Sequence, residues 1–154
     1  MKYKILEIKI GSAQSSTTTF SGLKLDLTSA ESLTSTPAAI TWDSAEFNTN
    51  ADINGNVYWT VSDPSKATIY TTGYYRIKAF IRAGSLGSNN SYTVDLRFNN
   101  TSSSSSSLSP NDSLDFDDIY NFTSGSYIQF FGSESGGVGE ISTTSFFELV
   151  KLGI

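Results

Sequence analysis

Apolar and polar residues alternate along two segments near the middle of the chain, residues 74–83 and residues 91–99. In the first segment an apolar side chain takes every second position, and Arg or Lys fills most positions between them. Successive side chains of a β-strand point to opposite faces, so each segment predicts a strand with one buried face. The inward positions are Tyr75, Ile77, Ala79 and Ile81 in the first segment, and Tyr92, Val94, Leu96 and Phe98 in the second.

Short apolar segments separated by turn residues recur along the rest of the chain, at the spacing typical of a sandwich or barrel. No long segment shows the i, i+3, i+4, i+7 apolar stripe of an amphipathic helix. The sequence therefore predicts an all-β protein. The further predicted strands are residues 20–27, 38–47, 56–61, 66–71, 114–120, 126–132 and 143–152.

Glycine and polar clusters predict the turns between these strands. Asn54-Gly55 predicts a type I′ hairpin, which needs φ > 0 at both central residues. Gly73 predicts a tight turn into the central strand, where a positive φ favours glycine. The polar segments 101–111 and 134–140 predict loops; the six-serine run in the first is expected to be flexible, and the glycines of the second favour a mobile tip.

The first 19 residues differ in pattern from the rest. Apolar residues among charges predict a short strand near the start, and a Gly/Ser/Thr-rich tract follows it up to Thr19. We therefore expect residues 1–19 to be an attachment segment and residues 20–154 to form the folded domain. The apolar residues expected to contact a partner are Ile5, Leu6, Ile8 and Ile10.

The length, net charge and residue types of the chain exclude several classes of function. A chain of 154 residues is long enough for one domain with its own core. Its net charge of −5 argues against nucleic acid as a partner, because such partners demand a basic face. No apolar run approaches the length of a membrane span. The chain has neither histidine nor cysteine, which excludes Ser-His-Asp and Cys-His catalysis and argues against a small hydrolase. We expect no cofactor.

Two other chemistries stay open. Asp112, Asp115, Asp117 and Asp118 could bind a hard cation such as calcium. The alternative is that they flank a strand and face water or partner cations. Aromatic residues could line a sugar site, although such residues more often form a core or an oligomer contact. These aromatic residues are Trp42, Phe47, Tyr58, Trp59, Tyr74, Phe80 and Phe131.

Several short motifs resemble the tumour necrosis factor and complement globular-head superfamily, and more closely its single-domain version in bacteriophage virion proteins. The central motif is Gly73-Tyr74-Tyr75-x-Ile77. The sequence departs from the family pattern at Ser126, where the family has Asp after a turn glycine, and at Asn100, where the family usually has Gly. The other matching pieces are residues 39–43, 46–49, 66–69, 96–100 and 145–149.

The resemblance implies a jelly-roll sandwich of ten antiparallel strands that forms compact trimers and binds other molecules instead of transforming them. It also implies that the strand after Gly73 and the strand before the turn at Gly125-Ser126 lie side by side on the sheet that faces other subunits. The charged and aromatic residues then expected at the trimer interface are Arg76, Lys78, Phe80, Asp115 and Asp117.

The function that follows is a homotrimeric knob located on a virion, as head decoration, head fibre or tail-appendage tip. Residues 1–19 would attach it to another virion protein, and a host surface glycan or protein is a further candidate partner. The alternative is a carbohydrate-binding or cell-adhesion module outside a virion, which aromatic residues clustered in loops would favour.

Overall fold

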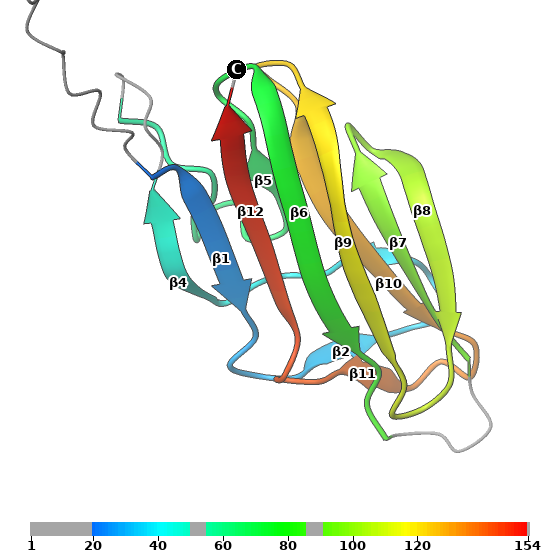
Figure 1. Ribbon diagram of the computed structural model, residues 1–154. Helices are drawn as coiled ribbons and strands as arrows, with labels where there is room; N and C mark the ends of the chain where they lie inside the picture. Colours follow the sequence, from blue (N-terminus) through cyan, green and yellow to red (C-terminus); the bar gives the residue numbers. More distant parts are fainter. Residues whose placement is uncertain (1–19, 50–54, 86–90, 154) are drawn as a thin grey trace, which may run out of the picture.

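The computed structural model describes residues 20–49, 55–85 and 91–153, which form two antiparallel sheets packed face to face (Figure 1). Within these ranges the chain forms no helix, and so none that could cross a membrane. The strands are β1 (Gly22–Asp26), β2 (Glu31–Leu33), β3 (Ala38–Ala39), β4 (Ser44–Thr49), β5 (Ala67–Thr68), β6 (Gly73–Arg82), β7 (Tyr92–Phe98), β8 (Thr101–Leu108), β9 (Ser113–Phe122), β10 (Tyr127–Glu134), β11 (Gly139–Ile141) and β12 (Phe146–Gly153).

Ten of these strands build the sandwich. The first sheet has the order β4-β1-β12-β6-β9. The second has the order β3-β10-β7-β8, and β5 also pairs with β10. The remaining two strands, β2 and β11, pair with each other at one end of the molecule (Figure 1). Consecutive strands repeatedly change sheet, as in a jelly roll, so the predicted all-β jelly-roll sandwich is confirmed.

The core lies between the two sheets and is built by the predicted alternation. Buried and exposed positions alternate along β6 from Tyr75 to Arg82, and the inward positions predicted for β7 are buried as far as Leu96. An aromatic cluster joins the two sheets near the centre. In it the Trp42 ring lies 6.3 Å from the Phe130 ring and 6.1 Å from the Phe147 ring, measured between centroids. Burial of these aromatic and aliphatic side chains is the main stabilising term.

The six-serine run is a strand, contrary to the prediction of a flexible loop. It forms most of β8, which pairs along its length with β7. Asn99 and Asn100, with φ angles of 51° and 66°, make the two-residue turn between these strands. Both residues take the left-handed conformation that a type I′ hairpin requires, and Asn tolerates it. Backbone pairing with β7 therefore overrides the weak strand propensity of serine.

Two other predicted strands differ from the structure. The segment 38–47 is split into β3 and β4, because the chain crosses between the sheets at residues 40–43. The segment 56–61 forms no ladder with β4; instead the side chain of Asn48 holds the backbone of Trp59, with its Nδ2 2.6 Å from the carbonyl oxygen of Trp59. Gly55 has a φ of 70° as a type I′ turn needs, while Asn54 lies outside the described residues.

Gly73 also differs from its prediction. It is the first residue of β6 and pairs with Phe122 of β9. Its φ of 159° is positive but lies near extended backbone, outside the left-handed turn conformation expected from the sequence. Few residues other than glycine adopt a φ of this sign, so the penalty expected for a β-branched residue stays a prediction.

A buried carboxyl group organises the glycine-rich loop that was expected to be mobile. Glu134, at the end of β10, is only 1% exposed. Its Oε1 accepts a hydrogen bond from the N–H of Gly136 (2.6 Å), and its Oε2 accepts one from the N–H of Val138 (2.8 Å). A Cβ on Gly139 would lie 2.6 Å from Cγ of Glu134, so only glycine allows this approach. The loop is thus tied to the core by one side chain.

We expect Glu134→Ala to lower the free energy of unfolding by about 2–3 kcal/mol, because it leaves two backbone N–H groups without their acceptor. Urea denaturation followed by circular dichroism measures the change. Glu46→Ala is the matched control, since its carboxylate is exposed and pairs with Lys24 at the surface, where an ion pair contributes about 0–1 kcal/mol. Equal unfolding midpoints for the two variants would contradict the anchoring role of Glu134.

Candidate functional site

The first candidate site is the outward face of the sheet β4-β1-β12-β6-β9, the side turned away from the core. We call it the outward face. Strand register places side chains on it in rows that run across the sheet. The middle row alternates in charge from β1 to β9. It consists of Lys24, Glu148, Lys78 and Asp117, each opposite the next in the ladder.

Arg76 and Asp117 form a two-pronged ion pair on this face, across the β6–β9 ladder. Nε of Arg76 lies 2.7 Å from Oδ1 of Asp117, and its second nitrogen lies 2.5 Å from Oδ2. The hydrogen bond from Arg76 lowers the pKa of Asp117, and the same bond raises the pKa of Arg76. Both side chains are about half exposed, so the pair is a surface feature of the single chain.

Aromatic side chains lie beside these charges. Phe80 and Phe146 face each other across the β6–β12 ladder and stack with ring centroids 6.1 Å apart. Lys24 and Lys78 each place an ammonium group within 6 Å of the Phe146 ring, at 5.7 and 5.9 Å. Such cation–π contacts let cations and rings share one surface.

Large exposed apolar residues also gather on the outward face. Ile119 is 54% exposed and stands opposite Arg76. Tyr74 is exposed on the same face of β6, and the ring of Phe20 lies over Gly22 of β1, where an added Cβ would meet it at 2.7 Å. Leu152 follows at the end of β12 and is exposed as well. A solvated sheet face is normally polar, so this concentration of apolar groups makes the outward face a candidate interaction surface.

The structure brings together all five residues predicted for the trimer interface. β6 and β9 are neighbours, as the resemblance implied, and the five side chains lie on the outward face of that ladder. Asp117 is the ion-pair partner of Arg76, whereas Asp115 stands opposite Phe80. Their role in an interface stays a prediction.

The acidic cluster of residues 112–118 is divided by the strand. Asp115 and Asp117 face outward, whereas Asp118 stands opposite the inward-facing Ile77. Asp112 lies in the turn before β9, where its Oδ2 accepts the N–H of Ser109 at 3.2 Å. Among the described residues, no three acidic side chains come close enough to share a metal ion. The strand and its turn thus place the four aspartates apart from one another.

The second candidate site is a groove of about 300 Å³ beside the crossing from β3 to β4. We call it the tryptophan groove. One wall comes from residues 41–43 and the other from the loop before β5. The carbonyl oxygen of Pro64 joins the walls, since it accepts the backbone N–H of Trp42 (3.1 Å) and the indole N–H of Trp59 (2.9 Å). Its lining residues are Thr41, Trp42, Asp43, Trp59, Val61 and Pro64.

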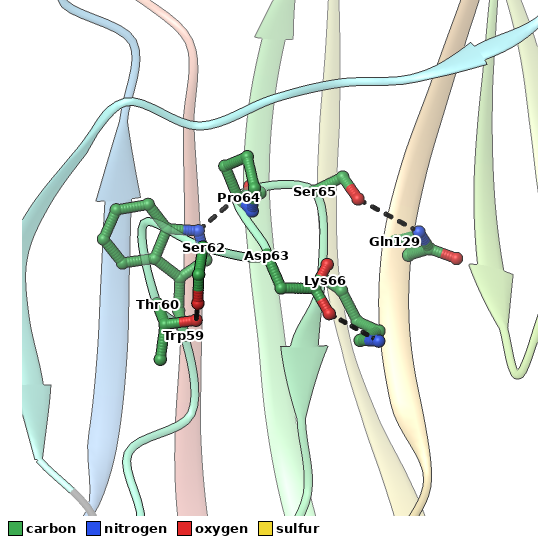
Figure 2. A network of polar contacts seen from close by, with 8 residues as sticks. All are labelled: Trp59, Thr60, Ser62, Asp63, Pro64, Ser65, Lys66 and Gln129. Carbon is green, nitrogen blue, oxygen red and sulfur yellow. Dashed lines mark hydrogen bonds and ion pairs between the residues drawn. The ribbon is translucent and has the colours of Figure 1, made fainter.

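Polar contacts hold the loop that carries Val61, as Figure 2 shows. The N–H of Asp63 donates to the carbonyl oxygen of Thr60 (3.1 Å), which closes a turn around Val61. The hydroxyl groups of Thr60 and Ser62 lie 3.0 Å apart, and Lys66 pairs with the Asp63 carboxylate at 2.5 Å. Val61 stays 80% exposed at the rim of the groove.

Asp43 supplies a carboxylate to the groove, and backbone groups fix its position. Its Oδ1 accepts the N–H of Thr28 (2.7 Å) and its Oδ2 accepts the N–H of Ser29 (3.0 Å). Burial alone would raise the pKa of Asp43, but these hydrogen bonds together outweigh burial and bring the pKa below its ordinary value. Asp43 is therefore ionised at neutral pH.

The sequence named Trp42 and Trp59 among aromatic residues that could line a sugar site but did not predict the groove. Both were placed in predicted strands, whereas both lie in connecting segments. The only local signal was Asp63-Pro64, a turn dipeptide, and nothing in it indicates which indole the Pro64 carbonyl accepts from. The predicted attachment residues Ile5, Leu6, Ile8 and Ile10 lie outside the described residues, as does Asn54.

Comparison with solved structures identifies the fold. Murine APRIL at pH 5.0 aligns with a TM-score of 0.59 at 12% identity, over 87% of this chain and 100% of that chain. Pika GITRL aligns with a TM-score of 0.53 at 15% identity, over 87% of this chain and 96% of that chain. A scan of the sequence against protein families finds no match, and neither does a search of curated proteins.

These structural neighbours are jelly-roll proteins of the tumour necrosis factor superfamily. Both alignments cover 87% of this chain. At 12–15% sequence identity, the structural similarity establishes the fold but does not identify a binding partner. The chain therefore has a tumour necrosis factor-like jelly-roll fold.

Proposed function

We propose that the chain is a non-enzymatic binding and structural protein that assembles as a homotrimer through the outward face. The observation that carries this proposal is the outward face itself, where Phe20, Tyr74 and Ile119 are exposed beside stacked aromatic rings. The tumour necrosis factor-like fold supports it, because compact trimers are what the sequence resemblance implies.

The charges of the face are compatible with burial in an assembly. Arg76 is already neutralised by Asp117, and Lys24 contacts Glu46 and Asp26. A buried charge is costly when it has no partner. Since these cations have acidic partners within the subunit, a neighbouring copy can cover the face without leaving them unpaired. A three-fold assembly requires two different surfaces to meet, so the face would contact another part of the neighbour.

We further propose a location for this trimer. It would be a knob on a bacteriophage virion, serving as head decoration, head fibre or tail-appendage tip. This proposal rests on the sequence resemblance, chiefly Gly73-Tyr74-Tyr75 and residues 39–43, and on the strand-like pattern of residues 1–19. In this proposal residues 1–19 add a strand to another virion protein, a mode in which backbone hydrogen bonds supply affinity. Three copies of any weak site would then act together.

We expect Ile119→Asp to convert the trimer to monomers while leaving the subunit folded. The new carboxylate would enter an apolar contact, and the nearest cation, Arg76, is already paired with Asp117. Sedimentation equilibrium measures the assembly, and the wild-type chain should sediment at three times its chain mass. Val138→Asp is the matched control, since Val138 is also exposed but lies in the loop before β11. A wild-type monomer, or an Ile119→Asp trimer as stable as wild type, would contradict the assembly mode.

Deleting residues 1–19 should leave a soluble trimer of near-normal thermal stability that is absent from purified virions. Differential scanning fluorimetry and sedimentation measure the first property, and immunoblotting of purified particles measures the second. Ile8→Asp is a milder test, because it keeps the linker and alters only the strand pattern. An unfolded or monomeric deletion product would instead indicate that the segment packs on its own trimer. Particles that retain the deleted protein would refute attachment through this segment.

A further inference from the structure

We propose that the tryptophan groove is a binding site for a neutral sugar ring, separate from the outward face. The two sites share no residue, because the groove is lined by the 41–43 crossing and the 59–64 loop, whereas the outward face is formed by strands.

The walls of the groove are formed before any ligand arrives. Trp42 and Trp59 are only 2% and 7% exposed, so their packed indoles make a rigid floor. Asn48 fixes the backbone of Trp59 twice, donating to its carbonyl oxygen (2.6 Å) and accepting its N–H (3.3 Å). The Pro64 carbonyl then holds both tryptophans at once. A site whose side chains are already ordered loses little entropy on binding.

The size and apolar character of the groove suit a single ring. Four of its six lining residues are apolar, namely Trp42, Trp59, Val61 and Pro64. Val61 projects at the rim and is the most exposed large apolar residue of the described chain. A volume of about 300 Å³ is at the lower end for ligand pockets, where a monosaccharide fits better than a larger ligand.

The polar groups of the groove act as hydrogen-bond acceptors. The Asp43 carboxylate is ionised, accepts the N–H groups of Thr28 and Ser29 as well as the Thr28 hydroxyl, and offers a ligand acceptor oxygens alone. The Thr41 hydroxyl donates to Glu31, with both carboxylate oxygens 2.8 Å away, so its own oxygen can only accept. No lining residue carries a positive charge. The ligand must therefore donate hydrogen bonds, and an anion is disfavoured.

A neutral sugar meets these requirements together. Its C–H groups can contact Val61 and Pro64, and its hydroxyl groups can donate to Asp43 and Thr41. An amine or a basic side chain also donates, but Trp42 and Trp59, only 2% and 7% exposed, offer little ring face for a cation–π contact. These arguments favour the sugar over the cation.

The experiment uses the intrinsic tryptophan fluorescence of the full-length chain. The chain has two tryptophans, and both line the groove, so a change in emission reports on this site alone. The probes are methyl glycosides of the common neutral hexoses, deoxyhexoses and N-acetylhexosamines. Methyl glucuronide serves as the anionic probe and lysine amide as the cationic probe. We expect a saturable change for at least one neutral glycoside, and binding at least ten-fold weaker for the glucuronide.

Two variants test whether the change in tryptophan fluorescence arises from a ligand bound in the groove. Val61→Ser should weaken binding of the responding glycoside at least five-fold, because the substitution removes an apolar wall of the groove. The thermal midpoint should not change, since Val61 is exposed and contributes little to the core. Ser62→Ala is the matched control on the same turn, since its hydroxyl contacts Thr60 and does not line the groove. The proposal is overturned if no neutral glycoside gives a saturable response, if Val61→Ser binds as wild type does, or if lysine amide binds more tightly than every glycoside.

Discussion

The register of β6 against its two neighbours is the constraint on which the rest of the molecule depends. β6 lies in the first sheet between β12 and β9, and its pairing with β9 runs without interruption from Gly73 to Arg82. Because side chains alternate with a period of two, a slip of one residue would turn Ile77 to solvent and Arg76 into the core. The burial of the inward side chains and the cost of burying Arg76 therefore favour the same register. That register also determines which residues form the outward face.

The outward face combines charge and apolar surface in a way that follows from this register. Lys78 has Glu148 on one side and Asp117 on the other, so opposite charges stand next to one another across three strands. Cross-strand pairs of opposite charge stabilise a sheet and like pairs destabilise it. With Lys24 and Arg76 paired within the subunit, the neighbouring aromatic and aliphatic groups can be covered without leaving these two cations alone.

The sequence predicted the long central strands well because each carries its own burial pattern. β6, β7 and β9 span nearly the expected residues, and the five interface candidates lie on one face. β8 could not be predicted, since its serines show no alternation and its strand form depends on pairing with β7. The absence of a strand at 56–61 has a similar cause, because Asn48 satisfies backbone groups of Trp59 that a ladder would otherwise pair. Local patterns predict an element only where its stabilisation is local. The tryptophan groove could not be predicted from local patterns for the same reason, since the Pro64 carbonyl joins two walls that are distant in sequence.

The edges of the sandwich also influence how the protein associates. β9, an edge strand, carries the exposed Asp117 and Asp118, and charges on an edge strand oppose uncontrolled strand pairing. Strand pairing at this edge is therefore disfavoured relative to contact through a face or a groove. A shallow groove binds weakly by itself and gains avidity when several copies act together. The outward face is the surface suited to bring such copies together, so the two sites complement each other while sharing no residue.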